Sequence, residues 1–178
     1  MPNTMTKSID LKKYIRDIPD FPKKGIIFKD ISPLLGNHRA FQEAIDLLAE
    51  RFRNEKIESI IAVEARGFIF GSALAYKLGV GFVPIRKKGK LPYQTKSITY
   101  QLEYGTDTLE MHSDAVSPKA RVLIVDDVLA TGGTVRAVVD LLKQHGAVIV
   151  GVVSLIELTF LKGRDRLKDI PFYSLIQY

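Results

Sequence analysis

The sequence predicts an α/β fold, in which a single domain over residues 1–178 has a mainly parallel sheet flanked by helices. Short apolar runs rich in β-branched residues alternate along the chain with stretches whose apolar residues recur at helical spacing. This alternation is typical of parallel sheets, whose strands are joined through helices and are buried on both faces. Polar and glycine-containing segments follow several of the apolar runs, where open α/β sheets bind their ligands.

Composition narrows the class of protein. The chain has 178 residues, 46% of them hydrophobic, which is enough for one globular domain with a buried core. The net charge of +6 suits either nucleic acid or a substrate with several phosphate charges. There is no cysteine, which excludes disulfides and thiolate metal sites and fits a reducing cytoplasm. No apolar stretch approaches the length of about 18 residues that a membrane span needs, so we expect a soluble cytoplasmic protein.

The N-terminal region, residues 1–35, divides into a helical and an irregular part. Leu11, Tyr14, Ile15 and Ile18 have helical spacing, so residues 7–18 are predicted to form a short amphipathic helix. Prolines end this helix, and residues 26–28 then form a loop or short strand. Phe28 is interpreted either as a core residue or as a wall for a flat aromatic ligand.

Two strand–turn–helix units come next. A helix is predicted over residues 41–52, a strand over 59–63 with a helix through residue 78, and a strand over 81–85. Arg66 follows the first of these strands, a position that surface and ion-pair arginines commonly occupy. Four cations then occur within residues 86–90. They indicate either a solvated surface or a site for a polyanionic leaving group.

Residues 91–114 alternate in polarity, which predicts a mobile β-ribbon that turns at Gly105 and Thr106 and acts as a lid. On spacing alone, Glu103 is an exposed acid of this ribbon. Near the C-terminus, residues 147–157 form the longest apolar strand, residues 164–168 a short surface helix and residues 171–178 an edge strand.

The strongest signal is RVLIVDDVLATGGT at residues 121–134. An apolar run over residues 122–125 predicts a buried strand, which ends at Asp126 and Asp127. The loop that follows has small and hydroxylated residues, and an amphipathic helix over residues 135–145 ends at Gly146. Because N–H groups at a helix N-terminus bind anions, this loop is predicted to bind a phosphate monoester.

The same residues fit an ordinary turn with a helix cap. A turn, however, requires neither the second carboxylate nor both threonines. The combination of strand, acid pair, Thr-Gly-Gly-Thr and helix therefore favours a functional site.

At these residues the chain resembles the phosphoribosyltransferases, whose signature is an apolar strand, two acids and a loop of this type. The resemblance implies the type I phosphoribosyltransferase fold. It also implies that Asp126 and Asp127 engage the ribose hydroxyls of phosphoribosyl pyrophosphate (PRPP). The 5-phosphate would be held by Ala130, Thr131, Gly132, Gly133 and Thr134.

The N-terminal segment is similar to the base-binding hood of the adenine-specific members of this family. The resemblance implies that main-chain groups of Ile27 and Lys29 read the adenine edge and that Phe28 stacks on the ring. Lys29 stands where arginine is frequent, so its implied role is a main-chain one. Leu129 and Leu158 are the other implied contacts of the base, and Leu158 would pack opposite Phe28.

Two further motifs carry the resemblance. The Glu-Ala-Arg-Gly-Phe turn implies that Arg66 binds pyrophosphate, and it makes the Glu64–Ala65 bond the candidate for the cis peptide found in many members of the family. The basic residues Arg86, Lys87 and Lys90 would share the pyrophosphate charge. The Leu-Glu-Tyr-Gly motif places Glu103 as the general acid/base at N7 of the purine, with Tyr104 beside it on the lid.

The implied reaction is adenine plus PRPP giving AMP and pyrophosphate, by a homodimer, with Mg²⁺ bound mainly through the substrate and no direct metal ligands. Neither nucleic acid nor a membrane is an expected partner. Two alternatives remain open. One is a phosphoribosyltransferase for another purine base, and the other is a non-catalytic, PRPP-sensing regulator that binds nucleic acid.

Overall fold

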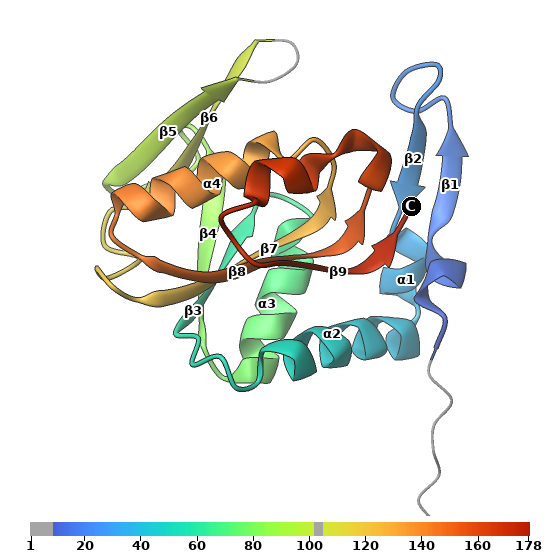
Figure 1. Cartoon of the computed structure of the whole chain (residues 1–178), viewed down its shortest axis with the longest axis horizontal. Coiled ribbons are helices and arrows are strands. Elements are labelled where there is room, and N and C mark those ends of the chain that lie inside the picture. The colour runs from blue at the N-terminus through green and yellow to red at the C-terminus, as the bar shows by residue number, and fades with distance from the viewer. Residues whose placement is uncertain (1–8, 102–104) are drawn as a thin grey trace, which may run out of the picture. The chain divides into compact units, whose positions relative to one another are not determined.

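The computed structural model describes residues 9–101 and 105–178. The chain divides into two compact units, of which the first ends at Leu47 and the second begins at Leu48. The second unit contains the larger sheet (Figure 1). Each unit is described by itself below.

The first unit is built on a two-stranded antiparallel sheet. A single 3-10 turn, Leu11–Tyr14, precedes β1 (Arg16–Pro19), which pairs with β2 (Ile27–Asp30). The helix predicted over residues 7–18 is therefore wrong in its described part. Ile15 is extended, because the chain after it pairs with β2 and gains ladder hydrogen bonds that one helical turn would not offer. A short helix that was not predicted, α1 (Ser32–Gly36), completes the unit's secondary structure before α2.

Helix α2 (His38–Phe52) begins in the first unit and ends in the second. Its apolar stripe agrees with the predicted helix over residues 41–52. Asn37 stands just before the helix, and its side-chain oxygen accepts a hydrogen bond from the N–H of Ala40 at 3.0 Å. The stripe is buried at Ala40, Ala44, Leu48 and Phe52.

The second unit contains a 7-stranded sheet with the order β5-β6-β4-β3-β7-β8-β9. Pairing is parallel from β4 across to β9, and antiparallel where β6 joins β4 and β5. The sheet is thus mainly parallel, as predicted. Its strands are β3 (Ser59–Val63), β4 (Gly81–Lys87), β5 (Thr95–Gln101), β6 (Thr106–His112), β7 (Arg121–Leu129), β8 (Val148–Glu157) and β9 (Phe172–Gln177).

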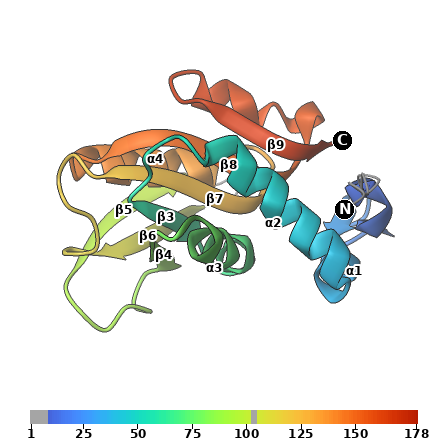
Figure 2. The ribbon, with the colours of Figure 1, turned by 90° about the horizontal axis from the view of Figure 1, so that it is seen from below.

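Helices α3 (Gly67–Leu78) and α4 (Gly133–Gln144) cover opposite faces of this sheet (Figure 2). Residues of one strand point alternately to the two faces. Ile61 on β3 belongs to the core cluster that includes the apolar side of α4, whereas Ala62 faces Gly71 of α3. A Cβ at Gly71 would lie 2.6 Å from that of Ala62, so α3 lies closer to the sheet than a larger residue would allow.

Two strands extend further than the sequence predicts. β4 continues through Arg86 and Lys87, so these two cations lie on the strand and not after it. β7 continues through both aspartates to Leu129. Its pairing with β3 ends at Val125, while its pairing with β8 persists to Leu129. The predicted end of β7 was wrong because pairing to one neighbour is sufficient to keep polar residues extended.

The predicted β-ribbon is present as β5 and β6, which pair from Thr95 with His112 to Gln101 with Thr106. Its role as a lid stays a prediction. The predicted C-terminal edge strand is β9, and the predicted surface helix is a 3-10 segment, Gly163–Leu167, preceded by a shorter one, Thr159–Leu161.

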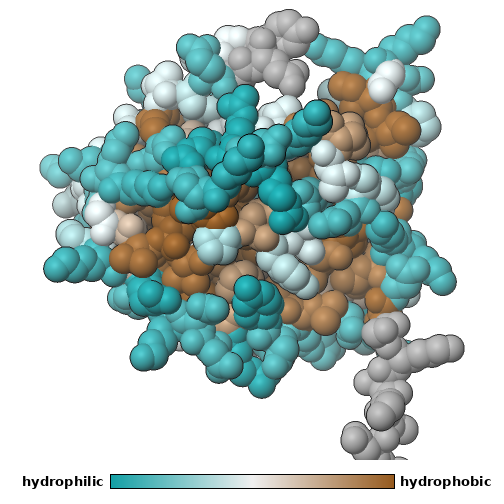
Figure 3. All heavy atoms as spheres, viewed as in Figure 1, coloured by the Kyte–Doolittle hydropathy of each residue, from teal (hydrophilic) through white to brown (hydrophobic). Residues whose placement is uncertain are grey.

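Hydrophilic residues gather over α4 on the face shown in Figure 3. Arg136 of α4 forms ion pairs with Asp140 and Asp169, and Lys143 pairs with Asp169 at 2.7 Å. No helix within the described residues is both long and apolar enough to cross a membrane.

Candidate active site

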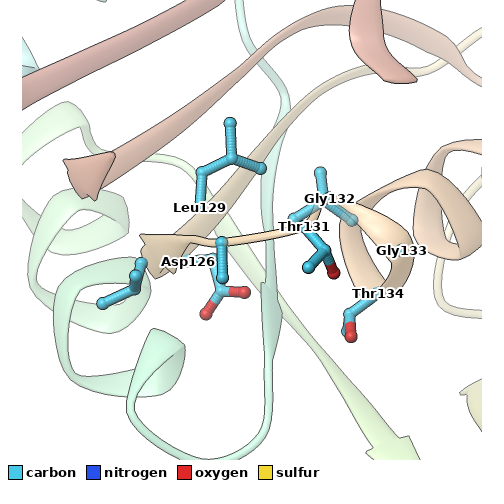
Figure 4. A pocket seen from close by; sticks show the side chains of 9 residues that line it. Asp126, Leu129, Thr131, Gly132, Gly133 and Thr134 are labelled. Carbon is cyan, nitrogen blue, oxygen red and sulfur yellow. The ribbon is translucent and has the colours of Figure 1, made fainter. Parts of the chain in front are cut away.

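The loop between β7 and α4 surrounds a small pocket of about 90 Å³ (Figure 4). That is well below the roughly 300–1,000 Å³ of pockets that enclose a whole ligand, so it suits a single small group. The carboxylate of Asp126 and the hydroxyls of Thr131 and Thr134 point to the same side of the loop, whereas Leu129 points to the opposite side. The pocket is lined by Asp126, Val128, Leu129, Ala130, Thr131, Gly132, Gly133, Thr134 and Val135.

The backbone of this loop is suited to an anion. Gly132 has φ of +78° and immediately precedes α4, so the chain turns sharply and the helix begins at Gly133. The first N–H groups of a helix have no acceptor within it, and the macrodipole adds positive potential. A phosphate seated here would accept hydrogen bonds from those N–H groups and from the threonine hydroxyls.

A second glycine supports the loop from outside. Gly163 begins the 3-10 segment after β8, and a Cβ on Gly163 would clash with the carbonyl oxygen of Ala130. A Cβ on Gly132 would in turn lie 2.6 Å from the carbonyl oxygen of Gly163. The two backbones are therefore in direct contact. Arg164 secures this turn through a bidentate ion pair with Glu157, at 2.6 and 2.9 Å.

The two aspartates have different surroundings. Asp127 is only 5% exposed, and its Oδ2 lies 2.8 Å from Nε of Arg66 in an ion pair that is not aligned as a hydrogen bond. Asp126 lies over the first residue of α3, where a Cβ on Gly67 would be 3.0 Å from Oδ1. Oδ1 of Asp126 also accepts the N–H of Asp127 at 2.9 Å. Of the two carboxylates, only that of Asp126 lines the small pocket.

Burial raises the pKa of Asp126 well above that of an ordinary aspartate, and the negative charge of Asp127 raises it further. Burial also raises the pKa of Asp127, although the guanidinium of Arg66 acts in the opposite direction. Ionisation of both carboxylates is therefore unfavourable in the free protein, and a cationic or hydroxyl-bearing ligand would make it less so.

The basic cluster Arg86, Lys87 and Lys90 is ion-paired at the carboxyl end of the sheet. Glu64 accepts hydrogen bonds from Arg86 at 3.1 and 3.2 Å and from Lys90 at 2.8 Å. Lys87 pairs with Asp107 of the ribbon at 3.0 Å. The hydrogen bonds from Arg86 and Lys90 lower the pKa of Glu64 to about 2.

The turn after β3 connects the acidic and basic parts of the site. Glu64 reaches towards β4, and Arg66 reaches towards β7, the two strands that flank β3. The Glu64–Ala65 peptide is cis, as the resemblance predicted. Arg66 then precedes the first turn of α3.

The ribbon contacts the first turn of α4 at Tyr100. Its hydroxyl lies 3.2 Å from Oγ1 of Thr134, and either group can be the donor. Tyr100 also packs against the apolar core of the second unit. This contact links the strand that leads towards Glu103 with the loop predicted to bind the 5-phosphate.

The residues predicted to bind the base have local partners of their own. On β2, Phe28 packs edge-to-face on Phe21 with ring centroids 5.2 Å apart, and Lys29 pairs with Asp17 at 2.7 Å. Leu129 is 1% exposed and belongs to the core, while Leu158 is partly exposed. The base-binding roles of Ile27, Phe28, Lys29, Leu129 and Leu158 stay predictions. Glu103 and Tyr104 lie outside the described residues.

Within the described chain, no group of three or more His, Asp or Glu side chains is arranged to hold a metal ion. Mg²⁺ commonly binds proteins through one or two carboxylates and completes its shell with substrate phosphates and water. The carboxylate of Asp126, which faces the phosphate pocket, fits that mode of binding.

Sequence reasoning missed four contributors to this site: Glu64 as the partner of the basic cluster, Gly67 beneath Asp126, Gly163 behind the phosphate loop, and Tyr100. Glu64 was noted only for its peptide bond, although its place one residue after β3 was a signal that it would reach the strand ends. The roles of Gly67 and Gly163 depend on tertiary approach and leave no periodic pattern.

Known proteins of one family are similar to this chain over most of its length. Residues 30–176 match the family described as the phosphoribosyl transferase domain. The chain is 58% identical over 169 residues to the adenine phosphoribosyltransferase of Roseiflexus sp. (strain RS-1), a match that covers 95% of this chain and 98% of the relative. It is 59% identical to that of Syntrophotalea carbinolica over 169 residues, covering 95% and 99%.

Solved structures give the same result. The crystal structure of adenine phosphoribosyltransferase from Thermoanaerobacter pseudethanolicus superposes with a TM-score of 0.92 at 54% identity, covering 94% of this chain and 98% of that one. The enzyme from Saccharomyces cerevisiae, complexed with D-2,5-dideoxy-2,5-imino-altritol 1,6-bisphosphate and adenine, gives 0.88 at 43% identity, covering 93% and 96%.

Proposed function

The chain belongs to the phosphoribosyltransferase family, among its adenine phosphoribosyltransferases, and we propose that it transfers the 5-phosphoribosyl group of PRPP to adenine in purine salvage. The products are AMP and pyrophosphate. The observation that carries the proposal is the small phosphate pocket beside Asp126, at the carboxyl end of a parallel strand. Such strand ends are where α/β sheets place their ligands.

The sugar phosphate is held by the loop after β7. The N–H groups at the start of α4 and the hydroxyls of Thr131 and Thr134 bind the 5-phosphate, and Gly132 allows the close approach. Asp126 and Asp127 accept hydrogen bonds from the ribose hydroxyls, directly or through water. Their negative charge also stabilises the positive charge that develops on the sugar as its bond to pyrophosphate breaks.

The leaving pyrophosphate is stabilised by cations at the neighbouring strand ends. Arg66 approaches it from the turn after β3, and Arg86, Lys87 and Lys90 approach from β4 and the turn after it. Preorganised positive charge lowers the barrier because negative charge accumulates on the departing oxygens.

The base is held by main-chain groups at Ile27 and Lys29, by the ring of Phe28, and by Leu129 and Leu158. Glu103, with Tyr104 beside it, exchanges a proton with N7 as N9 attacks the sugar. Closing the ribbon over the site excludes water, which would otherwise hydrolyse the activated sugar. These roles rest on the resemblance of their motifs to those of the family.

Mg²⁺, when bound, neutralises phosphate charge and helps the pyrophosphate to depart. Asp126 is the residue of this chain that would contact Mg²⁺, directly or through water, while oxygens of PRPP would supply most of its other ligands. We further propose that the protein acts as a homodimer and that it is located in the cytoplasm. The absence of cysteine supports the location, because it fits a reducing compartment.

Purified protein incubated with Mg²⁺, PRPP and adenine is expected to form AMP and pyrophosphate, quantified by chromatography. Parallel reactions with hypoxanthine, guanine and xanthine test the choice of base, and a clear preference for a 6-oxopurine would reject the assignment to adenine. Glu103→Gln is expected to lower kcat by roughly 100-fold or more, the usual contribution of a general acid/base. Turnover like that of the wild type in this variant would remove the role given to Glu103.

A further inference from the structure

The carboxylate of Glu64 is hydrogen-bonded to two of the cations that are proposed to bind pyrophosphate, Arg86 and Lys90. Its Oε1 lies 2.8 Å from Nζ of Lys90 and 3.1 Å from Arg86, and its Oε2 accepts a hydrogen bond from Nε of Arg86 at 3.2 Å. The Glu64 side chain is 15% exposed, whereas those of Arg86 and Lys90 are 34% and 47% exposed. An anion from solution can therefore reach the cations from their open side.

A carboxylate and a phosphoryl group use the same donors of a guanidinium. Both accept paired N–H bonds from the fork of an arginine, and both attract a lysine ammonium. Arg86 already uses Nε and one terminal nitrogen on Glu64, and its other terminal nitrogen donates to the carbonyl oxygen of Lys90 at 3.0 Å. Three of the five N–H donors of the guanidinium are thus in use, two of them on Glu64, so pyrophosphate that binds Arg86 must share the guanidinium with Glu64 or displace its carboxylate.

We propose that Glu64 is a positioning residue that competes with pyrophosphate for Arg86 and Lys90 and so limits how tightly this product is held. The inference rests on the proposed function, in which these cations receive the pyrophosphate. In the free protein, Glu64 holds both cations in place and offsets one of their two positive charges. When pyrophosphate departs, the carboxylate takes its place, so the cations are not left to hold the product.

The setting of Glu64 differs from that of a structural carboxylate in the same sheet. Glu157 is 3% exposed and accepts hydrogen bonds from Arg164, Ser174 and Gln177, so its charge is satisfied by neutral groups as well as by a cation. Glu64 is held by two cations at the ligand-facing ends of the strands. The side chains of Arg86 and Lys90 are open enough to solvent that an incoming anion can compete with Glu64 for their donors.

The test is the affinity for pyrophosphate, measured by titration calorimetry with Mg²⁺ at fixed ionic strength. Glu64→Gln keeps the size and an acceptor oxygen of the side chain but removes its charge. This variant is expected to bind pyrophosphate roughly three- to tenfold more tightly, because it lacks a negative charge that repels the anion at a partly exposed site. Product inhibition by pyrophosphate against PRPP should strengthen by the same factor.

Glu50→Gln is the matched control. Glu50 pairs with Arg53 at 2.6 Å on an exposed part of α2, so this substitution changes the net charge equally without touching the basic cluster. Its affinity for pyrophosphate is expected to match that of the wild type. If Glu64→Gln binds pyrophosphate no more tightly than Glu50→Gln, or more weakly, the inference is wrong and Glu64 merely supports the cluster.

Two further measurements keep the result interpretable. Glu64→Asp keeps the charge but withdraws the carboxylate by one methylene, so it is expected to tighten binding less than glutamine and in the same direction. Its result decides the matter if the glutamine variant does not fold. AMP formation by the wild type is measured in parallel. Its absence would contradict the proposed function, whereas AMP formation without tighter binding in the variants would contradict this inference alone.

Discussion

Gly132 and Gly163 are in backbone contact, because a Cβ on Gly132 would lie 2.6 Å from the carbonyl oxygen of Gly163. The turn after β8 therefore fixes the position of the phosphate loop. Gly163→Ala is expected to raise the KM for PRPP by at least about tenfold, since overpacking of this kind commonly costs about 1–3 kcal/mol and here displaces the loop. Steady-state kinetics with varied PRPP measure this effect.

Gly36→Ala serves as the control for that substitution. A Cβ at Gly36 would have no neighbour within 4 Å, so it makes the same chemical change without a clash. Its KM for PRPP is expected to equal that of the wild type. An unchanged KM in the Gly163→Ala variant would show that the turn does not position the loop.

Asp126 is expected to be needed for AMP formation and to lower the stability of the folded protein. Asp126→Asn can still accept the N–H of Asp127 but removes a partly buried charge next to a second carboxylate. We expect the variant to melt at a higher temperature than the wild type at pH 7 and to lose most of its AMP formation. A lower melting temperature would contradict the pKa argument.

The pH dependence of this stabilisation has a defined sign. The pKa of Asp126 is raised in the folded state. Its contribution to the free energy of unfolding is therefore fully present below the ordinary pKa of 3.8 and is lost as pH rises through the folded-state pKa. The melting temperature of Asp126→Asn relative to the wild type should therefore be lowest near pH 4 and increase as pH rises. Thermal melts across this range check the trend.

Tyr100 is expected to help position Thr134 for the phosphate. In the Tyr100→Phe variant the hydroxyl of Thr134 loses its partner at 3.2 Å, while the ring can still pack on the core. The KM for PRPP should rise by roughly two- to tenfold, the effect of one neutral hydrogen bond. The affinity for pyrophosphate alone should not change, and an equal loss of both affinities would show a general disturbance of the ribbon.

Glu157 is expected to stabilise the fold through its buried ion pair. Glu157→Gln removes the charge that holds Arg164, which is half exposed, so we expect a loss of about 1–3 kcal/mol in the free energy of unfolding. The hydrogen bond from Arg164 lowers the pKa of Glu157 below its ordinary 4.5. The difference in the free energy of unfolding between wild type and variant should thus be largest above pH 4.5 and decrease as pH falls. Denaturant titrations at several pH values measure it.

Matched melts of Asp140→Asn provide the reference for Glu157. Asp140 also pairs with an arginine, Arg136, but on the surface of α4. Its loss is expected to cost less than about 1 kcal/mol, as for exposed pairs in general. Equal losses in the two variants would mean that burial adds nothing to the pair at Glu157.

The sheet and the phosphate loop could be predicted because their signals are local. The apolar run before Asp126 and the glycines after it determine a strand and a helix start within a short stretch of chain. The helix predicted over residues 7–18 is wrong because helical spacing within one segment says nothing about a partner strand, and here β2 supplies one. The ion pairs of Glu64 join residues more than twenty positions apart, and no local pattern encodes such pairs.

Because the pairing of β7 with β3 ends at Val125 while its pairing with β8 continues to Leu129, the last residues of β7 are anchored along one edge only. Strand ends of this kind open locally at a smaller cost than the centre of a sheet. We therefore expect the hydrogen bonds around Asp126 and Asp127 to open locally while the rest of the sheet stays paired. A ligand bound in the loop after β7 would make this opening less frequent. Amide exchange at residues 126–129 would report substrate binding directly, without any turnover.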